Sequence, residues 1–479
     1  MSGELIEHCE RVWDDEILPA LSDYITIPAK SVAFDPDWEA NGHIDAAVEL
    51  IVSWGERRSI AGLSIEVVRL PGRTPLVFME VPASDGSQGT DGDNGNDRAT
   101  VMLYGHLDKQ PEMTGWRDGL GPWTPVLDRD RLYGRGGADD GYSAFAALTA
   151  IEALQAQGRP HSRCVVLIEA SEESGSPDLP AYVDALADRI GSPSLVICLD
   201  SGCVNYDRLW VTTSLRGVAS VVLTVEVLRH GIHSGAASGI VPSSFRILRR
   251  LLDRIEDPDT GEILVPELRR EPSAARLDQV RATAAEVGGA IATAWPWAGD
   301  TGPVTTDPLE ALLAKTWRPT LSVTGMDGIP AVRDGGNVLR PFTSVALSFR
   351  LPPGVDPTSA MDAVVDRLTA DPPHGATVRA KVVEGGPGWE APAQAPWLAE
   401  ALDQASTAAF GADARYIGEG GSIPFMGMLG ERFPDAQFVV TGVLGPGSNA
   451  HGPNEFLHVP TGKRVTSAVA LLLEANTSR

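Results

Sequence analysis

The sequence of 479 residues is poor in cysteine and in basic side chains. Its four cysteines have no CxxC spacing, which indicates neither a disulfide framework nor a thiolate zinc site and predicts buried free thiols. Lysine and arginine number 39 against 64 aspartates and glutamates, giving a net charge of −25 that repels nucleic-acid phosphates and anionic lipid. We therefore expect neither nucleic acid nor a membrane as a partner.

Long hydrophobic runs are missing as well. No apolar stretch approaches the ~20 residues of a membrane span, and the first 18 residues are acidic and amphipathic rather than basic and then apolar. Both features predict a cytoplasmic protein. At about 150 residues per domain, the length predicts two or three domains. The hydrophobic content of 43% is sufficient for each of them to have a core.

Several common catalytic motifs are absent. The sequence has no GxSxG, HExxH, GxGxxG or GxxxxGK pattern, which removes the usual support for α/β serine hydrolases, zincins, dinucleotide enzymes and P-loop ATPases. The glycine-rich run GRGGADDG at 134–141 ends in two acids, which would repel phosphate. A cation is therefore a more suitable ligand for this run than a phosphate group.

Apolar β-rich runs alternate with helical stretches in the first part of the chain. TVMLYGH at 100–106, RCVVLIEAS at 163–171 and SLVICLDSG at 194–202 are separated by helical segments such as 142–158. This alternation is typical of a helix-covered, mostly parallel sheet. Residues 84–98 have no apolar anchor and many turn formers, so we expect a mobile loop there.

The pattern changes near residue 217. From there strand and helix signals follow the order β-α-β-β-α-β, the split motif of ferredoxin-like domains, and the α/β pattern returns after a Pro/Gly-rich stretch at 384–396. We therefore predict an α/β fold with a discontinuous catalytic domain over 1–216 and 385–479. A ferredoxin-like domain over 217–384 is inserted into it.

Acidic and histidine side chains stand at or near the predicted carboxyl ends of several strands. Such ends meet at one edge of an α/β sheet, where crowded carboxylates cost several kcal/mol each unless a cation neutralises them. Two imidazoles and three carboxylates without thiolate suit Zn²⁺, Mn²⁺ or Co²⁺, and a bridging carboxylate can hold two ions about 3.5–4 Å apart. We therefore predict a dinuclear metal-dependent hydrolase, in which the adjacent Glu172-Glu173 pair supplies one ligand and one base.

Five ordered motifs resemble a known family. They are YGHLDKQP at 104–111, YGRGGADDG at 133–141, EASEESGS at 169–176, CLDSG at 198–202 and NAHGPNE at 449–455. In this order they resemble the co-catalytic metallopeptidases that include cytosolic nonspecific dipeptidase, carnosinase, glutamate carboxypeptidase, and the deacylases of acetylornithine and succinyl-diaminopimelate. The resemblance spans nearly the whole chain. It implies two divalent ions per subunit, Zn²⁺ before Mn²⁺ or Co²⁺, and a homodimer through the inserted lid domain.

The resemblance also implies the metal ligands. Asp139 would bridge the two ions, with His106 and Asp200 completing one site and Glu173 and His451 the other. The chain departs from the family's frequent DDKG pattern, because glycine follows the paired acids here. The missing lysine is not a ligand, so metal binding is unaffected, but the charge near the bridge becomes more negative.

Three further residues receive roles in catalysis from the same resemblance. Glu172 would be the general base that activates a metal-bridging water. Asp108 would orient the imidazole of His106 and raise its basicity. His233, in the segment HGIHSG, would reach the active site of the partner subunit and stabilise the tetrahedral oxyanion; His230 in the same segment leaves the register open.

The remaining implied residues would bind the substrate carboxylate. Asn337 and Arg350 fit lid positions that contact it, arginine being suited to bidentate carboxylate binding. Gly421 and Ser422, in GEGGSIPF, match a glycine-rich loop that closes round the peptide in the dipeptidase branch.

The motifs lie closer to the dipeptidase and carnosinase branch than to the deacylases. The leading function is therefore hydrolysis of dipeptides or short peptides with a free C-terminal carboxylate. A deacylase of N-acyl or N-carbamoyl amino acids would use the same metal machinery and remains an alternative. A catalytically silent scaffold on this fold is the second alternative, although no ligand or base of the pattern is missing.

Overall fold

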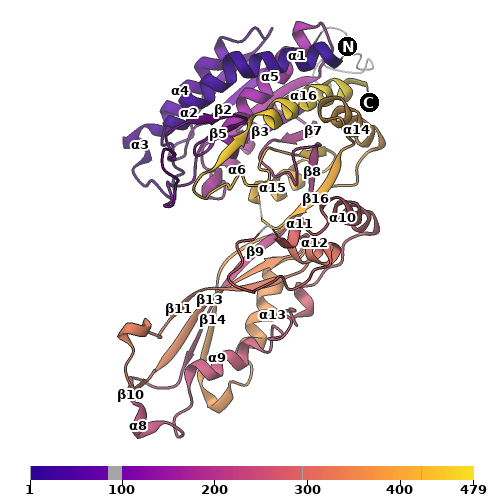
Figure 1. The fold of residues 1–479 in the computed structure, drawn as a ribbon. Coiled ribbons are helices and arrows are strands. Elements are labelled where there is room, and N and C mark those ends of the chain that lie inside the picture. Colours follow the sequence, from indigo (N-terminus) through magenta and orange to yellow (C-terminus); the bar gives the residue numbers. More distant parts are fainter. Residues whose placement is uncertain (1, 85–99, 294, 422, 479) are drawn as a thin grey trace. The chain divides into compact units, whose positions relative to one another are not determined.

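The computed structural model describes residues 2–84, 100–293, 295–421 and 423–478 (Figure 1). The chain forms two compact units. Unit 1 comprises Met1–Thr212, Ala391–Tyr416 and Met428–Arg479, and unit 2 comprises Thr213–Glu390 and Ile417–Gly427. The loop that the sequence places at 84–98 lies, except for its first residue, outside the described residues.

The sheet of unit 1 is mixed. Seven of its nine described strands follow one another in space as β1 (Ser64–Val68), β2 (Leu76–Val81), β6 (Arg163–Glu169), β3 (Thr100–His106), β7 (Pro193–Cys198), β17 (Gln437–Val440) and β8 (Trp210–Leu215). Strands β6, β3, β7 and β17 are parallel, whereas β1, β2 and β8 pair antiparallel to their neighbours. The prediction of a mostly parallel sheet is therefore wrong for the strands outside these four. One cause is the short connection from β1 to β2, because closely linked strands pair antiparallel.

Helices cover this sheet and share its core. They include α1 (Ser2–Val12), α2 (Leu18–Thr26), α4 (His43–Glu56), α5 (Tyr142–Ala156), α14 (Pro396–Phe410) and α16 (Val459–Ala475). Helix α5 is buried from Tyr142 to Leu154, in agreement with its alanine-rich and leucine-rich sequence. Helix α16 packs against α1, α5 and α14, so segments from both ends of the chain enclose one hydrophobic core.

The four parallel strands determine where the polar motifs lie. Their carboxyl ends point to one edge of the sheet. A short 3-10 turn, η3 (Glu172–Ser174), follows β6, and a single helical turn, η2 (Gly137–Gly141), leads into α5. The last strand, β18 (Phe456–His458), pairs with β5 (Arg131–Tyr133) and so brings the C-terminal motif to the segment before η2.

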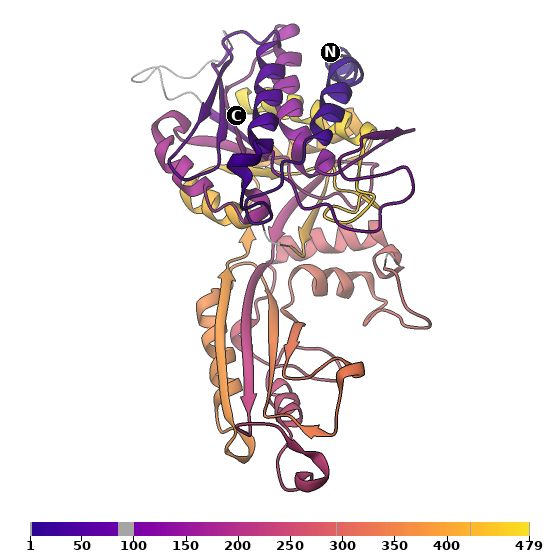
Figure 2. The same ribbon diagram turned by 90° about the vertical axis from the view of Figure 1, so that its left-hand side faces the viewer.

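Unit 2 contains a four-stranded antiparallel sheet in the order β11 (Thr320–Asp327), β13 (Phe342–Leu351), β9 (Gly217–Glu226) and β14 (Thr377–Gly386). Figure 2 shows the magenta β9 between its orange neighbours. Along the chain α9 (Ser244–Leu252) follows β9, and α13 (Pro357–Thr369) follows β13. Burial alternates along β9, so one face of the sheet packs on the core of the unit.

Unit 2 also holds elements that the sequence pattern did not reveal. They are α10 (Ala274–Val287), α11 (Ala290–Thr293), α12 (Pro308–Thr316) and the short strand pair β10 (Ile232–His233) and β12 (Val338–Leu339). In Figure 1 the β10 strand and the α12 helix lie at opposite ends of the four-stranded sheet.

Among the described residues, no helix combines the length and the apolar character that crossing a membrane requires. The four cysteines are buried free thiols. The cytoplasmic location remains a prediction from the sequence.

Candidate metal centre

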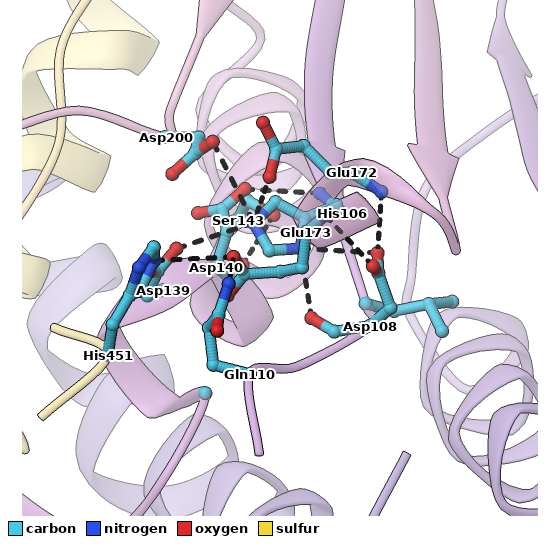
Figure 3. A network of polar contacts seen from close by, with 12 residues as sticks. His106, Asp108, Gln110, Asp139, Asp140, Ser143, Glu172, Glu173, Asp200 and His451 are labelled. Atoms are coloured by element: carbon cyan, nitrogen blue, oxygen red, sulfur yellow. Dashed lines mark hydrogen bonds and ion pairs between the residues drawn. The ribbon is translucent and has the colours of Figure 1, made fainter. Parts of the chain in front are cut away.

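Five segments of unit 1 bring histidine and carboxylate side chains together beyond the carboxyl ends of the parallel strands (Figure 3). His106 ends β3 and Asp200 follows β7, while Asp139 lies in η2. Glu173 lies in η3, and His451 lies in the segment between β17 and β18. These residues form two overlapping ligand sets, each with donor atoms within 4.8 Å of one another. One is His106, Asp139 and Asp200, and the other is Asp139, Glu173 and His451.

Asp139 is the residue that the two sets share. Its Oδ1 lies 3.4 Å from Nε2 of His106, and its Oδ2 lies 2.9 Å from Nε2 of His451. The two carboxylate oxygens therefore face different imidazoles (Figure 3). Nε2 of His106 is also 3.7 Å from Asp200, and Nε2 of His451 is 3.2 Å from Glu173. A carboxylate in this position can bridge two cations.

The orientation of the His106 imidazole suits metal binding. Its Nδ1 lies 3.0 Å from the backbone carbonyl oxygen of Asp108, which only accepts, so Nδ1 carries the proton. In the neutral ring this leaves the lone pair on Nε2, directed at the carboxylates of Asp139 and Asp200. Nε2 is buried and has no hydrogen-bond partner among the described residues. A cation would satisfy this atom.

Burial and mutual repulsion shape the acidity of the cluster. Burial and the charge of Asp139 raise the pKa of Asp200 to about 7, although His106 opposes the shift. Burial likewise raises the pKa of Glu172 and of Glu173 well above the usual range. Buried carboxylates this close together cannot all ionise without a compensating positive charge. The donor set of imidazole and carboxylate, together with the unpartnered Nε2 of His106, fits a pair of divalent ions.

Asp108 acts mainly on the backbone of the Glu172-Glu173 turn. Its Oδ1 accepts the N–H of Glu172 at 3.1 Å, and its Oδ2 accepts the N–H of Glu173 at 3.0 Å. The sequence analysis expected this carboxylate to orient His106, yet its nearer oxygen lies 3.5 Å from Nδ1, and the backbone carbonyl of Asp108 is closer to that nitrogen. The carboxylate of Asp108 therefore bonds to the turn and also lies within ion-pair distance of His106, so its role in orienting that imidazole stays a prediction.

The segment that carries His451 is held by a buried ion pair. Glu455 accepts from the guanidinium of Arg135 and, at 2.8 Å, from the N–H of Gly136. Arg135 also donates to the backbone oxygen of Gly452 at 2.9 Å. His451 has a φ of 64°, an uncommon left-handed conformation for a residue with a Cβ. The ion pair therefore links the segment before Asp139 to the one that presents His451.

The residues of unit 2 with a predicted role in catalysis or substrate binding fall into two groups. His233 on β10 pairs with Val338 on β12, and the backbone oxygen of Asn337 accepts the N–H of Ser234 at 2.9 Å. This strand pair adjoins the start of β13, whereas Arg350 lies near its end. Eight residue steps of about 3.4 Å separate the two ends by about 27 Å. Within unit 2 the structure therefore does not bring His233 and Asn337 to Arg350.

Gly421 belongs to the second group. The neighbouring Gly420 accepts through its backbone oxygen from Arg216, which directly precedes β9, and β9 pairs with the Arg350 end of β13. Ser422 lies outside the described residues.

Sequence reasoning missed several polar residues beside the metal centre. Asp140 accepts the N–H of His106 at 3.2 Å, and Gln110 donates to Oε2 of Glu173 at 2.7 Å. Both stand inside motifs that the sequence analysis quoted. Their position next to proposed ligands was the available signal for Asp140 and Gln110. The pairing of Arg135 with Glu455 had no signal in the sequence.

Comparison with known proteins identifies a family and several relatives. The model of peptidase family M20/M25/M40 matches residues 102–475. The cysteinylglycine-S-conjugate dipeptidase of Corynebacterium striatum is 28% identical over 369 residues, which cover 75% of this chain and 77% of that protein. The Cys-Gly metallodipeptidase dug1 of Schizosaccharomyces pombe is 25% identical, with 70% and 71% covered.

Two further similarities are to a Beta-Ala-His dipeptidase and to a solved structure. The Beta-Ala-His dipeptidase of Homo sapiens is 29% identical over 260 residues, 53% of this chain and 49% of that protein. The structure of the dipeptidase Dug1p from Saccharomyces cerevisiae superposes with a TM-score of 0.75 at 20% identity, covering 100% of this chain and 99% of that one. At this identity the superposition shows that the fold is shared.

Proposed function

We propose that this chain, which belongs to peptidase family M20/M25/M40, is a two-metal dipeptidase. Membership of the family makes it a metallopeptidase that hydrolyses amide bonds. One observation supports the proposal above all others. The two carboxylate oxygens of Asp139 face two different imidazoles, those of His106 and His451. This arrangement suits a bridging ligand between two ions rather than a ligand of one.

We assign the ligands on this basis. His106 and Asp200 would hold one ion, Glu173 and His451 the other, and Asp139 both. Zn²⁺ is the first candidate, with Mn²⁺ and Co²⁺ as alternatives, since imidazole and carboxylate accept all three. When bound, such a pair of ions lowers the pKa of water toward 7 and polarises the substrate carbonyl.

Glu172 is the proposed general base. Its Oε2 lies 4.0 Å from Nε2 of His106, beside the ligands, and its pKa is raised by burial and by the charge of Asp200. Its carboxylate would take a proton from the attacking water and pass it to the leaving amine. The carboxylate of Asp108 would hold this base in place through the N–H groups of the turn.

The inserted domain is proposed to act as lid and dimerisation surface. His233 and Arg350 stand at opposite ends of β13, so one peptide of dipeptide length cannot reach both within one copy of unit 2. Arg350 and Gly421 would bind the carboxylate of the substrate, while His233 and Asn337 would serve the active site of a second copy. His233 would there stabilise the oxyanion.

Complementation between two inactive variants tests this exchange. His233→Ala and Glu172→Gln should each lose most of their turnover alone, and mixing them through a dissociation step should restore it. The mixed dimer has one site with Glu172 intact and His233 supplied by the other subunit. Light scattering should report a dimer. A monomer, or a mixture that stays inactive, contradicts the role of His233 across the interface.

The relatives favour dipeptides over acylated amino acids as substrates. Their names specify Cys-Gly, cysteinylglycine conjugates and β-Ala-His. The deciding experiment measures product release from Cys-Gly, β-Ala-His, other free dipeptides, their C-terminal amides and N-acyl amino acids. Protein loaded with Zn²⁺ or Mn²⁺ is compared with a chelator-treated sample. We expect chelator-sensitive cleavage of free dipeptides.

Two outcomes would change the proposal. Faster cleavage of N-acyl or N-carbamoyl amino acids would indicate a deacylase with the same metal centre. If fully metallated protein cleaves no compound of the panel, the dipeptidase proposal fails and the silent scaffold becomes the better reading.

A further inference from the structure

Arg216 is a buried guanidinium of unit 2 whose hydrogen bonds all go to neutral acceptors. The residue is 8% exposed. Its Nε donates to the backbone oxygen of Gly420 at 3.1 Å. Its Nη1 lies 3.3 Å from each of three acceptors, the backbone oxygens of Ala314 and Arg318 and the hydroxyl of Thr320. No carboxylate of the described residues forms an ion pair with Arg216.

The third nitrogen of this side chain faces the glycine-rich loop. Nη2 has no hydrogen-bond partner within the described part of the chain, and it lies 3.1 Å from the position that a Cβ on Gly420 would occupy. A side chain at position 420 would press against Nη2 on this side. The N–H groups of Nη2 therefore remain available to a guest beside the loop.

A second positive charge lies near the first. Thr320, which accepts from Arg216, pairs in register with Arg350 across β11 and β13. Burial and the charge of Arg350 lower the pKa of Arg216 to about 10. Two guanidinium groups thus influence each other at one end of the sheet. An anion placed there would offset the free-energy cost of burying Arg216 and the repulsion between the two positive charges.

We propose that Arg216 binds the C-terminal carboxylate of the substrate through Nη2, together with Arg350, while Nε fixes the Gly420–Gly421 loop. The inference rests on the proposed dipeptidase function and adds a residue that determines specificity. Arg216 also meets a backbone oxygen in the last turn of α12, as a helix cap would. Capping accounts for Nη1, but not for the open Nη2.

The test compares a free dipeptide with its C-terminal amide in the metal-loaded enzyme. The dipeptide is the one that the wild type cleaves fastest. For Arg216→Gln we expect kcat/KM on the free dipeptide to fall about 10- to 100-fold, mainly through KM, because a hydrogen bond to a charged group is lost. Hydrolysis of the amide should change little. Arg216→Lys keeps the charge and should retain part of the preference for the free acid.

Controls separate binding from a structural role. Arg318→Gln removes a nearby charge that is already paired with Glu310, and it should leave the ratio of acid to amide unchanged. Metal content and melting temperature are measured for every variant. If Arg216→Gln lowers kcat/KM equally for both substrates, Arg216 only caps the helix and the inference is wrong. If the wild type cleaves neither substrate, the proposed function fails first, and the inference falls with it.

Discussion

The carboxylate of Glu455 lies between the guanidinium of Arg135 and the N–H of Gly136, and the two charged side chains are exposed by only 0% and 1%. The pair joins positions that are 320 residues apart in the chain. It fixes the segment of His451 against the segment of Asp139. Two of the three proposed ligands of the second ion, Asp139 and His451, therefore lie on segments that one buried contact joins.

Arg135→Met should weaken both the fold and the second metal position. Removing one partner of a buried ion pair leaves an uncompensated charge, which costs about 3–5 kcal/mol. We expect this loss in the free energy of unfolding of the chelator-treated protein, measured in urea. The affinity for the second divalent ion, measured by calorimetry, should fall more than that for the first.

The matched control for this variant is Arg69→Met. Arg69 pairs with Asp45 on the surface of the same unit, where an ion pair contributes up to about 1 kcal/mol. Metal affinity should be unchanged in the control. An equal loss of affinity for both divalent ions in Arg135→Met would show that the ion pair supports the unit as a whole and not the position of His451.

Glu172→Gln should abolish turnover while both ions stay bound. The amide cannot take a proton from water, and general-base catalysis typically contributes 10²- to 10⁴-fold, so kcat should fall by about that factor. Metal content per chain, measured by mass spectrometry, should remain at two. Glu173→Gln is the comparison, and it should lose the second ion. If the two variants show the reverse pattern, base and ligand are exchanged.

Gly105→Ala should distort the start of α5. A Cβ at this position would lie 2.1 Å from Oγ of Ser143 and 2.6 Å from Oδ2 of Asp140. Overpacking of this kind costs about 1–3 kcal/mol or more, and Asp139 would move with its neighbour. We expect lower stability in urea and weaker binding of both ions. Gly3→Ala, with no atom within 4 Å, should lower neither the stability nor the affinity for the ions.

Glu169→Gln should alter the pH dependence of stability. Burial and the charge of Asp108 raise the pKa of Glu169 to about 7 from an ordinary value of 4.5. The folded chain therefore binds this proton more tightly, so its stabilising effect is complete below pH 4.5 and is lost as the pH rises to about 7. Between pH 4.5 and pH 8 the wild type should lose up to about 3 kcal/mol relative to the variant.

Urea unfolding of chelator-treated protein at several pH values measures this difference. The carboxylate of Glu80 supplies the opposite case, because Arg189 and Arg163 lower its pKa despite burial. The stability of Glu80→Gln relative to the wild type should therefore fall as the pH rises toward 4.5, and the difference should stay constant above that value. Parallel curves for Glu169→Gln and the wild type would show that Glu169 does not titrate as inferred.

The sequence predicts those parts of the structure that depend on periodicity. Apolar runs located the strands β3, β6 and β7, and the ends of strands located the segments of His106, Glu173 and Asp200. Gathering these segments needs only the rule that parallel strands end at one edge. The antiparallel margins of the sheet were not foreseen, because pairing partners of flanking strands depend on contacts across the whole unit.

Side-chain partners were less predictable than strand positions. The carboxylate of Asp108 bonds to the turn of Glu172 because that turn is a single 3-10 coil whose N–H groups point back at it. The separation of His233 from Arg350 follows from the length of β13 and the place of the β10 and β12 pair. Neither geometry can be predicted from the local sequence.

The order of the proposed ligands along the chain has a consequence for biosynthesis. His106, Asp139, Glu173 and Asp200 are all made before unit 2, and His451 is made after it. Because α16 packs against α1 and α5, and β17 lies beside β7 within the sheet, the core that supports the first ligand set is complete only once these later segments have been made. Binding of divalent ions to the proposed centre would therefore follow the synthesis of both parts of unit 1, including the pairing of Arg135 with Glu455.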